Sequence, residues 1–166
     1  MGNKNIIVIV DNVRSAHNIG SIFRTSDGLG VDKIFFVGLC PTPKRPNDQR
    51  LPHVILRAEK QIAKTAIGAE TSVEFEYYEQ LLEAITAAKE QGYQVVALEQ
   101  DQKSIEIADF IPQNKTALVL GSEVDGITKA NLELVDQIVE IPMMGKKESL
   151  NVAVSAAIII YHCLLP

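Results

Sequence analysis

Short apolar segments rich in β-branched residues alternate with helical patterns along the whole chain. The segments with strand character are residues 5–10, 33–38, 72–77, 93–98, 116–120 and 137–141. The helical patterns cover residues 18–30, 53–65 and 79–90, and a last one begins at Ser149. Alternating strands and helices with many valines and isoleucines are typical of a parallel sheet covered on both faces. The sequence therefore predicts an α/β domain with a mainly parallel sheet and flanking helices.

Length and composition narrow the class of protein further. The 166 residues fit one domain, and 46% apolar with 22% charged residues exclude a disordered chain or a coiled-coil rod. The longest apolar run, residues 152–165, is shorter than the roughly 20 residues that cross a bilayer, so no membrane partner is expected. Cys40 and Cys163 lie far apart without metal-ligand spacing, which indicates reduced thiols in a cytoplasmic protein and no metal site.

The charges are unevenly distributed. Residues 1–64 contain ten Lys/Arg and five Asp/Glu, whereas residues 65–166 contain six and sixteen, for a net charge of −5. A basic first third is compatible with a polyanionic partner even though the whole chain is acidic. An accidental imbalance on a solvated surface is the alternative.

The loop after the first strand is polar and leads into a helix. Asn18 is a suitable N-cap, and free N–H groups at a helix N-terminus bind phosphate. Arg24 follows within two turns. The alternative for Arg24 is a surface ion pair with Asp27, three residues further on.

The loop after residues 116–120 has the pattern G-x-E-x-x-G from Gly121 to Gly126. It differs from the dinucleotide pattern G-x-G-x-x-G because Glu123 replaces the glycine that approaches a pyrophosphate. The carboxylate would repel a phosphate but accept a cofactor with a cationic centre or a ribose. A plain connection between a strand and a helix is the alternative.

The loop of residues 141–152 precedes the terminal helix. Pro142 ends a strand, Gly145 permits a tight turn and Ser149 is a natural N-cap. Asn151 is less easily explained, because asparagine is a poor helix former. No G-x-S-x-G, H-E-x-x-H or similar motif supports a hydrolase or a metal enzyme.

Together and in this order, the three loops resemble the signature motifs of the SpoU/TrmH family of SPOUT RNA methyltransferases. The motifs are N-x-G-x-x-x-R at residues 18–24, L-G-x-E-x-x-G at 120–126, and I-P-M-x-G at 141–145 with S-L-N-V at 149–152. The resemblance covers nearly the whole chain. Ser122 and Ala153 are small departures from the commoner residues.

The resemblance implies a SPOUT fold with a C-terminal deep trefoil knot, a rare exception to unknotted topology. It implies S-adenosylmethionine as cofactor, a homodimer, and methylation of a ribose 2′-hydroxyl in tRNA or rRNA. We expect a single SPOUT methyltransferase domain over residues 1–166 without an appended RNA-binding domain. The alternatives are an RNA-binding SPOUT-fold protein that lacks transfer activity and a SPOUT enzyme that methylates a base.

The resemblance also assigns site residues. The predicted cofactor-binding residues are Leu98, Gly121, Ile141, Ser149 and Leu150. Arg24 is the expected catalytic arginine, supported by Asn18, Glu123 and Asn151, and no metal is needed. The resemblance implies that Arg24 activates the ribose hydroxyl as a base or holds the adjacent phosphate. Because a guanidinium rarely loses its proton, stabilisation of the developing alkoxide and the phosphate has at least equal weight.

Basic residues supply candidates for RNA contact. We predict that Arg14, Lys44, Arg45 and Arg50 bind RNA; the last three belong to a basic stretch over residues 44–64 that follows the second strand. A solvated loop and helix face is the alternative. The terminal helix is apolar around nearly its full circumference, which predicts that a second subunit covers one flank. Otherwise its own domain must cover it entirely.

Overall fold

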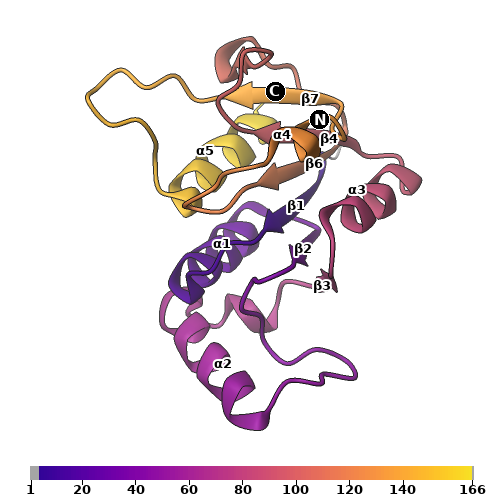
Figure 1. The fold of residues 1–166 in the computed structure, drawn as a ribbon, viewed down its shortest axis with the longest axis vertical. Coiled ribbons are helices and arrows are strands. Elements are labelled where there is room, and N and C mark those ends of the chain that lie inside the picture. The colour runs from indigo at the N-terminus through magenta and orange to yellow at the C-terminus, as the bar shows by residue number, and fades with distance from the viewer. Residues whose placement is uncertain (1–3, 166) are drawn as a thin grey trace.

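The computed structural model describes residues 4–165 (Figure 1). These residues contain one seven-stranded sheet with the order β3-β2-β1-β6-β4-β7-β5. All neighbouring strands are parallel. In chain order they are β1 Asn5–Asp11, β2 Lys33–Val37, β3 Phe75–Tyr78, β4 Gln94–Leu98, β5 Ile105–Glu106, β6 Lys115–Leu120 and β7 Gln137–Glu140. The parallel α/β prediction is confirmed over the described residues; positions 1–3 and 166 of the predicted domain lie outside them.

The six strands expected from the sequence are all present, with ends shifted by one to three residues. The two-residue strand β5 is too short for a periodic signal, and its pairing with β7 alone defines it. The central strands β1 and β6 pair in register, with Ile9 opposite Val119. Because helices cover both faces of this centre, both strands are apolar at nearly every position.

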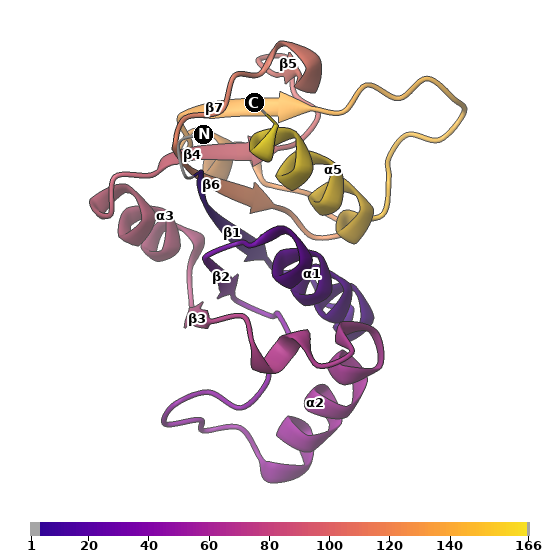
Figure 2. The same ribbon diagram turned by 180° about the vertical axis from the view of Figure 1, so that it is seen from behind.

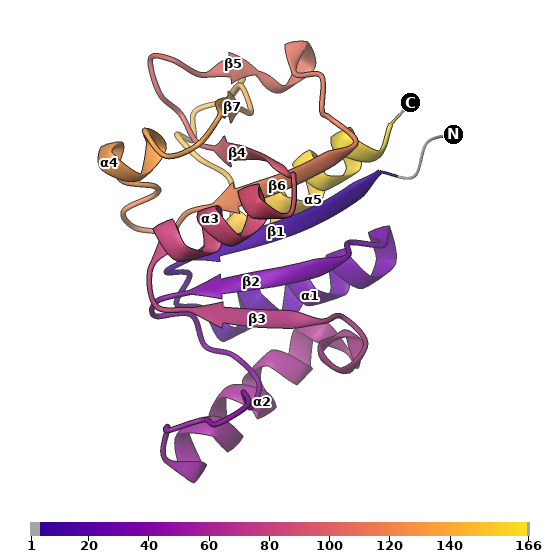
Figure 3. The ribbon, with the colours of Figure 1, turned by 90° about the vertical axis from the view of Figure 1, so that its right-hand side faces the viewer.

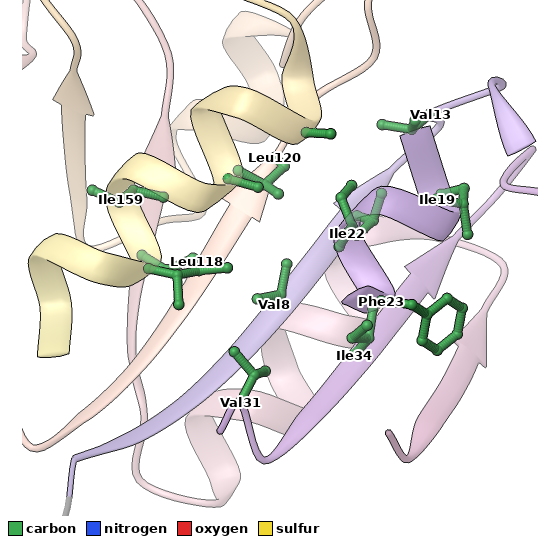
Figure 4. Close-up of a cluster of buried hydrophobic side chains, with 14 of the residues drawn as sticks. Val8, Val13, Ile19, Ile22, Phe23, Val31, Ile34, Leu118, Leu120 and Ile159 are labelled. Carbon is green, nitrogen blue, oxygen red and sulfur yellow. The ribbon is translucent and has the colours of Figure 1, made fainter. Parts of the chain in front are cut away.

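Helices cover the two faces of the sheet unequally (Figure 3). The face that carries Val8, Ile34 and Leu118 packs against α1 (Ala16–Leu29) and α5 (Val152–Leu164). The opposite face packs against α3 (Leu81–Glu90) and the short α4 (Lys129–Leu132). Figure 4 shows side chains from α1, α5 and the central strands meeting in the first of these cores.

Helix α2 (Pro52–Ala66) packs on α1 rather than on the sheet, at the end of the molecule away from β7 (Figure 2). Gly20 of α1 makes this packing close, because a Cβ there would collide with the side chain of Thr65 and the carbonyl of Ile62. The Thr65 hydroxyl donates to the carbonyl of His17 at 2.8 Å. The contact therefore holds α2 against the first turns of α1.

Two predicted helix caps are wrong. The N-cap of α1 is Ser15, whose hydroxyl accepts from the N–H of Asn18 at 3.2 Å, so Asn18 lies inside the first turn. The N-cap of α5 is Asn151, which accepts from the N–H of Ala153 at 2.9 Å, and Ser149 lies upstream of the helix. Serine and asparagine cap equally well, so the path of the chain decides between them. The N-cap position also explains an asparagine at the start of α5.

Cys40 and Cys163 are buried and free. In the part of the chain that the structure describes, no helix is long and apolar enough to span a membrane. The trefoil knot remains a prediction.

Candidate functional site

The three motif loops lie at one edge of the sheet, where β1, β6 and β7 end at their carboxyl ends, the usual ligand position in open parallel sheets. A cavity of about 690 Å³ lies there beside the end of β4. Its lining includes all the predicted cofactor residues: Leu98, Gly121, Ile141, Ser149 and Leu150. The structure therefore brings together five residues that are up to 52 positions apart in the chain.

The loop of residues 121–127 is a tight, internally bonded turn. The N–H of Gly126 donates to the carbonyl of Ser122 at 3.1 Å, and the Ser122 hydroxyl accepts from the N–H of Asp125 at 3.0 Å. Gly126 has a φ of +61°, which favours glycine, and a Cβ on Gly121 would lie 2.7 Å from the backbone nitrogen of Ile127. Both motif glycines are therefore required by the backbone path.

Hydrogen bonds connect the three motifs. The side-chain amide of Asn18 donates to Glu123 Oε1 at 2.6 Å, and Asn151 Nδ2 donates to Asn18 Oδ1 at 3.1 Å. The second carboxylate oxygen of Glu123 faces the backbone N–H of Arg14 at 3.4 Å. Glu123 and Asn151 also line the cavity. Three of the four predicted catalytic residues thus form one chain of side chains, Glu123–Asn18–Asn151.

Arg24 lies outside this chain and outside the cavity lining. It is six residues after Asn18 on α1, about 9 Å further along the axis and on another side of the helix. Its side chain is exposed. The alternative ion pair with Asp27 is not formed; that carboxylate accepts from the Ser72 hydroxyl at 2.6 Å. The guanidinium is therefore free to meet a ligand from solvent.

The predicted RNA-contact residues fall into two groups. Arg14 and Lys44 are exposed. Arg50 instead binds Asp48 at 2.5 Å and donates to the carbonyls of Thr42 and Pro43, which holds the loop between β2 and α2 in shape. The guanidinium also keeps the pKa of Asp48 well below its usual range.

Arg45 has a structural contact as well. Its guanidinium lies 3.6 Å from the centroid of the Tyr77 ring, and its backbone N–H donates to Asp48 at 3.1 Å. The exposed positive charge of the stretch continues along α2, on Arg57, Lys60 and Lys64. The predicted basic cluster therefore consists of an exposed set and a set that also stabilises the loop.

Comparison with known proteins decides the family. The family model described as the SpoU rRNA Methylase family matches residues 5–161. This chain belongs to the SpoU methylase family. The match spans all three motif loops, so the predicted family is confirmed.

Several relatives of this chain are named as tRNA methyltransferases. The chain is 28% identical over 95% of its length to the Escherichia coli K12 tRNA (guanosine(18)-2′-O)-methyltransferase, of which it covers 62%. It is 31% identical over 95% of its length to the enzyme of the same name from Thermus thermophilus, of which it covers 73%. The chain therefore spans about three fifths to three quarters of these relatives.

Solved structures share the fold. The TrmH/SpoU tRNA modifying enzyme of Aquifex aeolicus superposes with a TM-score of 0.75 and 28% identity, covering 96% of this chain and 74% of that one. An AdoMet-bound rRNA methyltransferase from Sinorhizobium meliloti gives a TM-score of 0.79 at 21% identity, covering 99% and 58%. The predicted SPOUT fold class is thereby confirmed for this chain.

Asp11, at the end of β1 and outside the cavity lining, is 4% exposed, and burial raises the pKa of its carboxyl. Among the lining residues that sequence reasoning missed are two adjacent polar ones. Glu99 and Gln100 follow β4 and line the cavity. Their position directly after a buried strand was the available signal. Within residues 4–165, no group of three or more His, Cys, Asp or Glu side chains is arranged to hold a metal ion.

Proposed function

We propose that this SpoU methylase transfers a methyl group from S-adenosylmethionine to a ribose 2′-hydroxyl of tRNA or rRNA. The hydrogen-bonded chain Glu123–Asn18–Asn151 carries the proposal, because it joins all three family motifs beside one cavity. The relatives named tRNA (guanosine(18)-2′-O)-methyltransferase support the same reaction class.

The cavity suits S-adenosylmethionine by size and charge. Its volume of about 690 Å³ lies within the range of about 300–1,000 Å³ typical of small-ligand sites. Leu98, Ile141 and Leu150 offer apolar contact for an adenine ring. The charged residues of the lining are Glu99, Asp101, Glu123, Asp125, Glu140 and Lys129. This acidic balance favours a ligand with a sulfonium and an ammonium group over a phosphorylated cofactor.

When bound, S-adenosylmethionine supplies a methyl group on a positively charged sulfur. The residues of this protein orient the reactants and stabilise the charge that develops during transfer. The Glu123–Asn18–Asn151 chain fixes the loops of residues 121–127 and 141–151 relative to α1, which favours in-line positioning of the reactants. Arg24 stabilises the developing alkoxide and the neighbouring phosphate, since a guanidinium can donate two parallel hydrogen bonds to an oxyanion.

We propose a homodimer formed through α5. One side of α5 is buried in the domain, but Val154, Ile158, Tyr161 and Leu165 are 38–58% exposed. Their spacing of four, three and four residues places them on one side of the helix, as a continuous apolar stripe. Light scattering is expected to give about twice the 18.2 kDa of one chain at micromolar protein, and a value near 18.2 kDa would contradict the dimer.

We propose that RNA docks on the basic surface next to the first motif loop. Arg14 lies in that loop, and Lys44, Arg45 and Arg50 follow β2, which pairs with β1 at the same sheet edge. Such residues bind phosphates without reading sequence, so RNA shape would select the target.

Incubation of the protein with radiolabelled S-adenosylmethionine and bulk tRNA or rRNA, followed by nucleoside analysis, tests the function. The expected product is a 2′-O-methylated nucleoside. Label on a base would identify a base-methylating enzyme. RNA binding without label would identify an RNA-binding protein that lacks transfer activity.

A further inference from the structure

The chain leaves β4 at Leu98 and passes directly along the cavity. Glu99 and Gln100 both line it, between the loop of residues 121–127 and the loop of residues 141–151. The backbone N–H of Glu99 donates to the carbonyl of Val139 at 3.0 Å, which continues the pairing of β4 with β7. The two side chains therefore start from a backbone fixed by the sheet.

The Glu99 carboxylate clamps the first of these loops. Its Oε2 accepts from the backbone N–H of Ile127 at 2.8 Å, and its Oε1 accepts from the N–H of Gln100 at 3.0 Å. A Cβ on Gly126 would collide with this carboxylate, so the loop is packed directly against it. Hydrogen bonds from backbone N–H groups to a carboxylate are stronger than those between neutral groups.

The Gln100 side chain clamps the second loop. Its Nε2 donates to the carbonyl of Glu148 at 2.9 Å. Between residues 4 and 165, this is the one hydrogen bond that joins segment 142–150 to another part of the chain. The segment extends away from the body after β7 (Figure 1), and residues 144–150 are exposed. The segment is otherwise held at its two ends, by β7 and by Asn151, which caps α5 and donates to Asn18.

We propose that Glu99 and Gln100 are positioning residues that hold the two cavity loops in their binding arrangement and thereby set the affinity for the methyl donor. The proposal rests on the proposed function for its ligand. Loops that are already ordered lose less conformational entropy when a ligand binds, so loss of either clamp weakens binding. Glu99 acts through the loop that carries Glu123, and Gln100 acts through the loop that carries Ser149 and Leu150.

Substitutions with matched controls test the affinity. Glu99→Gln keeps the size but leaves a single acceptor for two N–H donors, and Glu99→Ala removes both acceptors. Calorimetry with S-adenosylmethionine is expected to show Kd raised about tenfold or more for Glu99→Ala and for Gln100→Ala, and by less for Glu99→Gln. The controls Glu106→Gln and Gln102→Ala change exposed side chains at the same sheet edge and should leave Kd within twofold.

Amide hydrogen exchange without ligand distinguishes positioning from direct ligand contact. Glu99→Gln should accelerate exchange over residues 122–127 and leave segment 142–150 unchanged. Gln100→Ala should accelerate exchange over segment 142–150 and leave residues 122–127 unchanged, so each variant is the control for the other. A melting temperature within a few degrees of that of the unaltered protein identifies the variants that remain folded. If Glu99→Ala does not fold, Glu99→Gln and Gln100→Ala test the proposal.

Unchanged Kd in Glu99→Gln and Gln100→Ala, with binding by the unaltered protein intact, would overturn the inference. Weaker binding without any local change in exchange would also overturn it, since the residues would then contact the ligand directly. Failure of the unaltered protein to bind S-adenosylmethionine with or without RNA would instead refute the proposed function. The exchange pattern alone would then decide whether the two clamps exist.

Discussion

The side-chain amide of Asn18 donates a 2.6 Å hydrogen bond to the carboxylate of Glu123, a residue 105 positions further along the chain. The bond connects the first turn of α1 to the glycine-bounded loop after β6. The other end of the same amide, Oδ1, accepts from Asn151. One side chain therefore aligns three loops, and its geometry explains why an amide rather than a carboxylate occupies residue 18.

We expect the pair of Asn18 and Glu123 to be energetically coupled. In a double-mutant cycle of Asn18→Ala and Glu123→Gln, urea unfolding should give a coupling free energy of about 0.5–1.5 kcal/mol. Asn18→Asp should lower the rate of methyl transfer more than Asn18→Ala, because it places a second negative charge next to the Glu123 carboxylate. His17→Ala, an exposed neighbour on α1, is the control. Strictly additive single effects would contradict the coupling.

Arg24→Ala should reduce the rate of methyl transfer by roughly 100-fold or more while the Kd for S-adenosylmethionine stays unchanged, because Arg24 is outside the cavity lining. Arg24→Lys should retain part of the activity, since the charge remains but the two-pronged hydrogen bonding is lost. Single-turnover kinetics and calorimetry measure the two quantities. Full activity of Arg24→Ala would exclude a catalytic role.

Removal of exposed basic residues should weaken RNA binding and its salt dependence together. Lys44→Ala and Arg57→Ala are each expected to reduce the slope of log affinity against log salt by about 1, with cofactor affinity unchanged. Lys103→Ala, beside the outermost strand β5 and on the opposite side of the sheet from β2 and α2, is the control. Filter binding at several salt concentrations provides the measurement.

The loop residues need a separate variant. Arg50→Ala removes the closer ion partner of Asp48, whose side chain is 1% exposed, and leaves it only the Arg45 guanidinium at 3.8 Å, so loop disorder would accompany the loss of charge. Neutralisation of Lys44, Arg45 and Arg50 together should therefore be compared with Asp48→Asn, which loosens the loop without removing a cation. An unchanged salt slope in the triple variant would place the docking surface elsewhere.

Asp11→Asn should stabilise the protein at pH 7. Burial raises the pKa of Asp11 in the folded state, so its contribution to stability is fully present below the unfolded-state pKa. That contribution is lost as the pH rises through the folded-state pKa. The difference in melting temperature between Asp11→Asn and the unaltered protein should therefore grow from pH 4 to pH 7. A difference in melting temperature that does not change with pH would contradict a raised pKa of Asp11 in the folded state.

Cys40 and Cys163 should resist thiol reagents in the folded protein. Burial raises the pKa of both thiols to about 12, so almost no thiolate is present at pH 8. Labelling with a chromogenic disulfide is expected to be slow in buffer and rapid in urea, where two thiols per chain react. Rapid labelling in buffer would show that α5 or the loop after β2 opens readily.

The sequence by itself determined the parallel character of the sheet, six of the seven strands in the described residues, the longer helices and the loops that form the cavity. These follow from properties that neighbouring residues carry together: apolar runs long enough for buried strands, and glycines where the backbone turns. The resemblance to the family assigns Leu98, Gly121 and Ile141 to one site, and the rule that ligands gather at the carboxyl ends of parallel strands agrees with that placement. The ordered motifs were sufficient for the family.

The tertiary structure alone decided which partner each polar side chain takes. Ser15 rather than Asn18 caps α1, and Asn18 is thereby free to bind Glu123. Arg50 is committed to Asp48, and Glu99 bonds to Ile127 across 28 positions. The sequence contains several chemically equivalent acceptors for each donor. The packing of the sheet and helices decides which of them lies within bonding distance.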